Sequence, residues 1–297
     1  MLEQFVEHSQ IYILIPFLFC MKSTFFLTFS IIKWFWLKSN GCTEQELKLI
    51  FSTRKEMFSL KEILAHHSER KVRIIDGLCR KGYHFGHGIF LMLFSDFVIS
   101  DPEVALISVR GSTITMLLTM LLLYTSNSKA ANMLYGAKQR IMDGKTSRLN
   151  VLSAMFCSAG QYIAMYLITS KILINSIPPE QIFVVGYFVY LPMTIGDALG
   201  EVVGSIWGKH KLPVWGIGEV NKKSIAGTLA VFLGSLLPLF LVIYLKDVSL
   251  IYVQLAFLVS IVTTFVELYA PRSTDSFFIP VVNAFVVLGW LWGVGML

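Results

Sequence analysis

The chain has 297 residues, of which 55% are hydrophobic and 15% charged; its net charge is +6 and its mean hydropathy is +0.66. This composition excludes an ordinary water-soluble domain and predicts an integral membrane protein surrounded by membrane lipids. Basic loops beside membrane spans account for the positive charge, so we expect no nucleic-acid partner. We therefore predict an all-α, polytopic membrane protein.

Apolar runs that can cross, or nearly cross, the ~30 Å hydrocarbon layer predict about eight transmembrane helices. The first run contains Lys22 and Lys33, and it leaves three alternatives open: one tilted span, a bent helix, or two short pieces. It exceeds the apolar region of a cleavable signal peptide, which we therefore do not expect. The runs are 11–37, 85–100, 104–124, 151–174, 181–207, 225–244, 250–270 and 277–297.

Between the first two runs, residues 43–79 mix Leu, Ile and Phe with charges at helical spacing. This pattern predicts a cytosolic amphipathic helix, or a pair of them, at the membrane interface. With the first span it forms an N-terminal unit of residues 1–79, followed by a membrane-embedded unit of residues 80–297.

If the spans alternate in direction, 20 of the 25 Lys and Arg residues fall on one side of the membrane. The positive-inside rule makes this side cytosolic and places the N-terminus outside. The four cysteines share no short spacing and predict neither a disulfide framework nor a zinc site.

The most informative segment is 196–228, where acids and glycines recur at spacings of three and four residues and are therefore expected on one face of a helix. A charge in hydrocarbon costs at least ~2.5–3.5 kcal/mol, so Asp197 and Glu201 are expected in a polar environment. The glycines by themselves favour close helix packing, and the alternative is the close approach of a ligand. These glycines are Gly200, Gly204 and Gly208.

Asp197 and Glu201 are hard oxygen ligands one helical turn apart, which suits Mg²⁺. A basic loop follows, and its cations can offset phosphate charge or can be ordinary positive-inside flanks. Together these groups are typical of phosphoryl or nucleotidyl transfer. The loop residues are Lys209, His210, Lys211, Lys222, Lys223 and Ser224.

Further polar groups lie near the same predicted membrane edge. His84 could position or deprotonate a hydroxyl, or it could cap the interface. Glu267 is a second intramembrane acid. It could form an ion pair with Arg272 or Lys223, or it could take part in catalysis or support the site. Asp275 could cap the last helix or bind the metal.

Three blocks resemble the membrane-embedded CTP-dependent lipid-alcohol kinases, that is, the dolichol, phytol and farnesol kinases and the yeast-type diacylglycerol kinase, with phosphatidate cytidylyltransferase as a distant relative. The central block, GDALGEVVGSIWGKHKLP followed by NKKSIAGT, is the specific one. RKGYHFGHG and ELYAPRSTDSFFIP resemble the outer family elements.

The resemblance implies that residues 80–297 are a kinase-like catalytic domain that transfers the γ-phosphate of CTP to a lipid alcohol, with isoprenoid alcohols as the expected class, at the cytosolic face with Mg²⁺. The implied metal ligands are Asp197, Glu201 and Asp275. The implied catalytic residues are Asp197, His84, Lys222, Lys223 and Asp275, with Glu267 behind them. The implied nucleotide contacts are Arg80, Lys81, Gly200, Gly204, Gly208, Lys209, Lys211, Ser224 and Gly227.

Two alternatives stay open. Nucleotidyl transfer of the phosphatidate cytidylyltransferase kind shares the acid, glycine and lysine pattern, although the Pro-Gly-His-Gly-Gly and Asp-Arg-x-Asp signatures of that enzyme are absent here. A cation-coupled transporter would also use intramembrane acids and glycine-broken helices, but no inverted repeat of the 196–228 segment is visible.

Overall fold

The computed structural model of the protein is mostly helical. It describes residues 2–51, 67–98, single positions between 104 and 133, 147–168, 176–216, 219–270 and 274–297. The helices and strands are α1 (Leu2–Ser39), α2 (Glu44–Ile50), α4 (Glu69–Val98), α7 (Ser147–Ile168), α9 (Pro179–Leu191), α10 (Asp197–Trp207), β1 (Lys211–Gly216), β2 (Glu219–Ser224), α11 (Ile225–Leu245), α12 (Tyr252–Tyr269) and α13 (Asp275–Gly293). A π-helical turn, Pro192–Gly196, joins α9 to α10.

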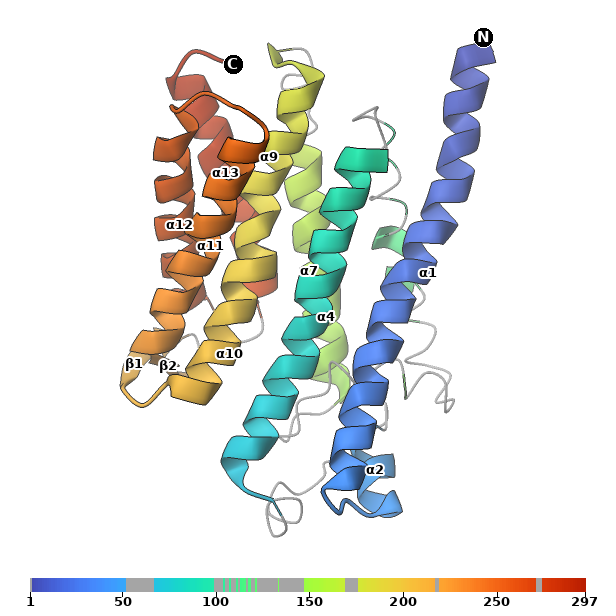
Figure 1. Ribbon diagram of the computed structural model, residues 1–297, viewed down its shortest axis with the longest axis vertical. Coiled ribbons are helices and arrows are strands. Elements are labelled where there is room, and N and C mark those ends of the chain that lie inside the picture. The colour runs from blue at the N-terminus through green and yellow to red at the C-terminus, as the bar shows by residue number, and fades with distance from the viewer. Residues whose placement is uncertain are drawn as a thin grey trace.

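The long helices run side by side, with α1 at one edge next to α4 and with α9 to α13 grouped on the other side (Figure 1). Five helical stretches in the described part of the chain are long and apolar enough to cross a membrane. This confirms the predicted helical membrane class, whereas the predicted number of about eight spans is not confirmed. The five are Tyr12–Ser39, Gln181–Trp207, Ile225–Leu245, Tyr252–Tyr269 and Asp275–Gly293.

The remaining three predicted spans have different outcomes. Run 85–100 overlaps the second half of α4, which begins much earlier, at Glu69. Most of run 104–124 and the end of run 151–174 lie outside the described residues. The predicted boundary between residues 79 and 80 lies inside α4, because this helix continues through the charged stretch into the apolar one.

The first run forms one continuous helix, so α1 is neither broken nor split into two pieces. Both of its lysines are buried against neighbouring segments. Lys33 Nζ lies 2.7 Å from Asp76 Oδ1 on α4, and Lys22 Nζ donates a hydrogen bond to Thr113 Oγ1 at 3.2 Å. These contacts explain how an apolar helix carries two internal cations, because buried charges require polar partners.

The predicted interfacial segment 43–79 contains α2 and the start of α4. Thr43 and Glu46 form a capping box at the start of α2: Thr43 Oγ1 accepts from the Glu46 amide at 3.2 Å, and Glu46 Oε2 accepts from the Thr43 amide at 2.7 Å. Leu47 and Ile50 of α2 then pack with Leu37 at the end of α1.

The main apolar core lies between α7, α9, α11, α12 and α13. Its fully buried members include Phe188, Leu239, Leu255 and Val287, one from each of the last four of these helices. The core residues of α11, α12 and α13 lie toward the ends of these helices that are opposite to Lys223, Glu267 and Asp275, and their packing fixes how the three helices sit side by side.

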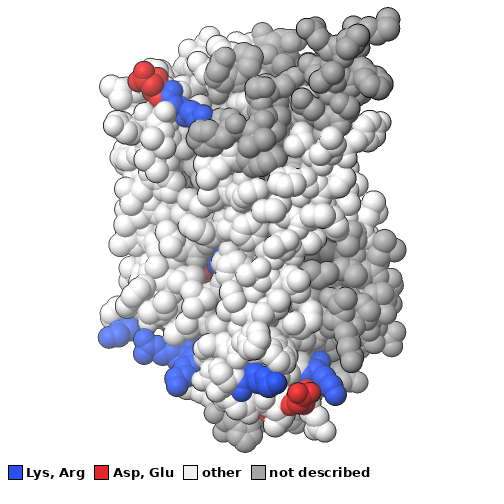
Figure 2. All heavy atoms as spheres, turned by 45° about the vertical axis from the view of Figure 1, so that its right-hand side comes forward, with Lys and Arg blue, Asp and Glu red and all other residues white. Residues whose placement is uncertain are grey.

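The predicted basic loop contains a two-stranded antiparallel hairpin, which the all-helical prediction missed. Lys211 pairs with Ser224 and Gly216 pairs with Glu219. Val214, Trp215 and Val220 favour extended structure and explain the strands. The prediction included only helices, because the apolar runs on both sides of this loop have the length of membrane spans. The hairpin joins α10 to α11 at the end of the molecule where Lys and Arg side chains gather (Figure 2).

A substitution at Gly160 can test the packing of α7 on α13. A Cβ added at Gly160 would lie 2.6 Å from the Cα atom of Phe277, which is backbone and cannot rotate away. We therefore expect Gly160→Ala to lower the free energy of unfolding by about 1–3 kcal/mol, measured by denaturant unfolding of the purified protein in detergent micelles.

Gly289→Ala is the matched control, because nothing lies within 4 Å of an added Cβ at that position in α13. This control should be neutral or more stable by up to about 1 kcal/mol, since alanine is the better helix former. Equal effects of the two substitutions would contradict the described contact between α7 and α13.

Candidate functional site

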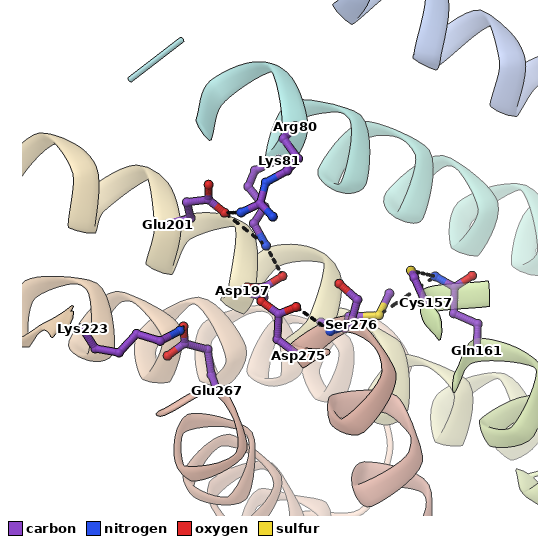
Figure 3. Close-up of polar contacts among 11 residues, drawn as sticks. Arg80, Lys81, Cys157, Gln161, Asp197, Glu201, Lys223, Glu267, Asp275 and Ser276 are labelled. Atoms are coloured by element: carbon purple, nitrogen blue, oxygen red, sulfur yellow. Dashed lines mark hydrogen bonds and ion pairs between the residues drawn. The ribbon is translucent and has the colours of Figure 1, made fainter. Parts of the chain in front are cut away.

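Charged side chains from five elements lie close together inside the helical bundle (Figure 3). They come from α4, α10, β2, α12 and α13, which are far apart in sequence. The members of this charged cluster are Arg80, Lys81, Asp197, Glu201, Lys223, Glu267 and Asp275.

The Lys81–Asp197 ion pair lies deepest in the cluster. Their side chains are only 2% and 3% exposed, and Lys81 Nζ donates directly to Asp197 Oδ2. Lys81 Nζ also lies 3.5 Å from Glu201 Oε2, and Glu201 is ion-paired with Arg80. Two adjacent cations of α4 thus face two acids that are one turn apart on α10.

The backbone before Asp197 is unusual. Residues Pro192–Gly196 form a π-helical turn, in which Thr194 Oγ1 donates to the Leu191 carbonyl at 3.2 Å. One-turn π segments inside helices occur frequently at functional sites, because they change which face of the following turn points inward. Here the turn immediately precedes the most deeply buried acid of the cluster.

The acids and glycines of α10 form two neighbouring stripes that face different helices. Asp197 and Glu201 face α4, whereas Gly200 and Gly204 face α11. Adjacent residues in a helix are 100° apart, so an acid at 201 and a glycine at 200 need not share a contact surface. The acids and the glycines, which were expected on one face of the helix, therefore have separate contact surfaces.

The glycines permit a close contact between α10 and α11. A Cβ at Gly200 would lie 2.3 Å from Val231 Cγ2, and one at Gly227 would lie 2.8 Å from the Gly200 carbonyl oxygen. One at Gly204 would lie 3.1 Å from Ser224 Oγ. Helix packing, the first of the two interpretations, is what these contacts show; the implied nucleotide role of Gly200, Gly204, Gly208 and Gly227 stays a prediction.

Ser224 ends β2 and caps α11. Its Oγ accepts a hydrogen bond from the Gly227 amide at 3.1 Å, which satisfies one of the free amides at the start of the helix. The cap fixes the chain direction between Lys223 and α11, so the side chain of Lys223 reaches α12.

Lys223 is ion-paired with Glu267, which lies in the last turn of α12. Of the two partners predicted for Glu267, the structure has Lys223, and Arg272 lies outside the described residues. Burial disfavours the charged form of Lys223, but the carboxylates of Glu267 and Asp275 and the hydrogen bond to Glu267 outweigh burial and raise the pKa of Lys223 above its usual value.

Asp275 is the first residue of α13, and Thr274 occupies the capping position that was one prediction for Asp275. Asp275 Oδ1 accepts a hydrogen bond from the Ser276 amide at 2.9 Å. Figure 3 shows the Asp275 carboxylate turned toward Asp197. Asp197 and Asp275 are therefore the two acids that face each other from different helices.

The other predicted site residues lie around this cluster. The ring of His84 contacts the ring of Tyr83, with centroids 5.3 Å apart. Lys209 and Lys211 are exposed beside the hairpin. Lys222 pairs with Pro213 in the hairpin, and the position of its side chain lies outside the description.

The predicted Mg²⁺ ligands are carboxylates, and the structure has them near one another. Among the described residues, no group of three or more His, Cys, Asp and Glu side chains is arranged to hold a metal ion. Mg²⁺ is commonly bound by one or two carboxylates with substrate phosphates supplying further oxygens, so Asp197 and Asp275 fit this ion in donor type and number.

Sequence reasoning missed the pairing of α4 with α10. Arg80 and Lys81 were assigned to the nucleotide, but in the structure they are the ion-pair partners of Glu201 and Asp197. The available signal was charge balance: two membrane-embedded acids require nearby cations, and two adjacent cations precede another apolar run.

The Lys81–Asp197 contact can be measured with a double-mutant cycle. Removal of either partner leaves a buried charge without its main counter-ion, so Lys81→Met and Asp197→Leu should each destabilise the protein by about 3–5 kcal/mol. The double variant should lose clearly less than the sum, as measured by denaturant unfolding in detergent. A cycle of Lys81→Met with Asp247→Leu, in the turn after α11, should be additive; additivity of the Lys81 and Asp197 effects would contradict the pair.

No protein-family model matches the chain, and comparisons with curated proteins and with solved structures also find no match. The likeness to lipid-alcohol kinases therefore depends on the three sequence blocks alone. Function has to be argued from these blocks together with the charged cluster.

Proposed function

We propose that the protein is a multi-pass membrane kinase that transfers the γ-phosphate of CTP to a lipid alcohol, with an isoprenoid alcohol as the first choice. The observation that carries this proposal is the convergence of Lys81, Asp197, Lys223, Glu267 and Asp275 at one end of the helices. The specific sequence block at 196–228 supplies two of the five elements that build the cluster, α10 and β2.

The burial of these charges favours a functional role over simple packing. Acids and bases within membrane helices are costly, and they usually mark binding or transfer sites. A buried ion pair is weak support for stability, because apolar residues of similar size often stabilise a fold at least as well. Seven charged residues on five elements are more than the packing of these helices requires.

The cluster offers the groups that phosphoryl transfer needs. Asp197 and Asp275, with Glu201 one turn away, would hold Mg²⁺, which supplies charge neutralisation at the nucleotide phosphates when bound. Lys223 stays cationic because its pKa is raised, so it can attract a γ-phosphoryl group. Lys81 and Arg80, which now bind acids, can also bind phosphate oxygens.

In the proposed reaction the hydroxyl oxygen of the lipid forms a bond to the γ-phosphorus. The bond from that phosphorus to the β–γ bridging oxygen breaks, and CDP leaves. The hydroxyl proton passes to a base, for which Asp275, Glu267 and His84 are the candidates. Phosphoryl transfer depends more on alignment and charge stabilisation than on a strong base.

The site is proposed to face the cytosol. Lys and Arg side chains gather at the lower end of the molecule (Figure 2), and the hairpin that carries Lys223 of the charged cluster lies at that end (Figure 1). Positive residues are enriched in cytoplasmic loops, and CTP is a cytosolic solute. The hydrophobic acceptor would reach the same end of the bundle from the bilayer.

Transfer of label distinguishes this proposal from its alternatives. Purified protein is incubated with Mg²⁺ and γ-labelled CTP, with phytol, farnesol, dolichol and diacylglycerol offered separately. We expect labelled lipid monophosphate from at least one alcohol. Asp197→Asn, which keeps the side-chain shape, should lower the rate by on the order of 100-fold or more.

Asp247→Asn is the matched control. Asp247 has a φ angle of 47° in the turn after α11, a conformation that asparagine adopts easily, so this variant should keep full activity. Label from the α-phosphate in the lipid product would instead show cytidylyl transfer. Solute uptake into sealed vesicles without any transfer would show a carrier, and an unaltered rate in Asp197→Asn would exclude the assigned role of Asp197.

A further inference from the structure

A second group of cations lies outside the charged cluster, on the surface where α4, α10 and the hairpin meet. Arg70, Lys71 and Arg73 lie in the first turns of α4, Lys209 lies between α10 and β1, and Lys211 is the first residue of β1. All five side chains are exposed. We call these five residues the cationic rim.

A hydrogen bond from a side chain to the backbone joins the α4 part of the rim to the end of α10. Arg70 Nη2 donates a hydrogen bond to the Ile206 carbonyl, in the last turn of α10, at 3.0 Å. Burial and the nearby positive charge of Arg73 lower the pKa of Lys211. Such an arrangement is relieved when an anion binds between them.

The rim also lies at the level where candidate membrane spans end. Trp207 is the last residue of one span and is 61% exposed, and Ile225 is the first residue of the next and is 52% exposed. Leu212 of β1 is 36% exposed between them. Exposed aromatic and aliphatic side chains beside cations are typical of the zone where acyl chains meet lipid headgroups.

We propose that the cationic rim binds the headgroups of anionic phospholipids. Lipid phosphates are fixed at this level in the bilayer, so they meet Arg70, Lys71, Arg73, Lys209 and Lys211 without leaving the membrane plane. Trp207 and Leu212 would contact the acyl chains beneath the bound headgroups. In the charged cluster, in contrast, Lys81 and Asp197 are buried, and the acids Asp197, Glu201 and Glu267 are paired with cations.

This interaction would anchor the hairpin and the start of α4 to the membrane surface. Both segments lead directly into the charged cluster, through Lys223 in β2 and through Arg80 and Lys81 in α4. A bound headgroup would therefore hold two of the five elements that build the cluster. The inference does not require the chain to be a kinase, because lipid binding is measured without turnover.

The test is a titration of the full chain in detergent with phosphatidylglycerol or phosphatidylcholine, followed by native mass spectrometry. Each Lys or Arg near an anionic lipid surface contributes about 1 kcal/mol, which is about five-fold in affinity. We expect tighter binding of phosphatidylglycerol than of phosphatidylcholine by the wild type, and about 25-fold weaker phosphatidylglycerol binding by Lys71→Gln/Arg73→Gln. Phosphatidylcholine binding should not change.

Lys246→Gln is the control for a lost positive charge, because Lys246 follows α11 at the opposite end of the molecule. It should bind phosphatidylglycerol like the wild type. Equal affinity of the wild type and Lys71→Gln/Arg73→Gln for phosphatidylglycerol would overturn the proposal. It would also be overturned if this double variant bound CTP more weakly while its lipid preference stayed intact, since the rim would then be a nucleotide site.

Discussion

Burial of opposite charges between α4 and α10 is the constraint on which the arrangement of the other helices depends. Lys81 and Asp197 are almost completely enclosed in a largely apolar bundle, so neither can lose the other without a large penalty. The position of α4 is fixed further by Lys33 of α1, which binds Asp76 one turn before Arg80. The position of α10 is fixed on its other side by α11. The two helices are thus held at a separation that keeps their charges in contact.

Glycine and acid play separate parts in α10. Gly200 and Gly204 let the backbone of α11 approach, and this approach brings Ser224 and the end of β2 next to α10. Asp197 and Glu201 point to the neighbouring helix on the adjacent stripe. Close packing therefore serves the proposed site indirectly, because it delivers Lys223 to the same end of the bundle as the acids. The glycines need not touch a ligand for this to hold.

The hairpin shows why local patterns were an incomplete guide to this chain. The lysines and glycines predicted a basic loop, but they did not predict its strands. The composition of a membrane protein favours helical interpretations, and the strands are only six residues long. Likewise, α4 begins at Glu69 and runs through a predicted boundary, since a helix can pass from a charged stretch into an apolar one without a break. In α1, the two lysines left three alternatives; the structure has one continuous helix, in which Asp76 and Thr113 are the polar partners of the two lysines.

The amino-acid sequence by itself determined the helical membrane class, the end of the molecule where positive charge gathers, and the set of acids that require polar partners. It also limited the partner of Glu267 to two cations. Only the tertiary structure decided that Lys81 pairs with Asp197, that Arg80 pairs with Glu201, and that Lys223 is the partner of Glu267. The physical reason is that the cost of a buried charge depends on residue type and burial, whereas the identity of its partner depends on which helices pack together.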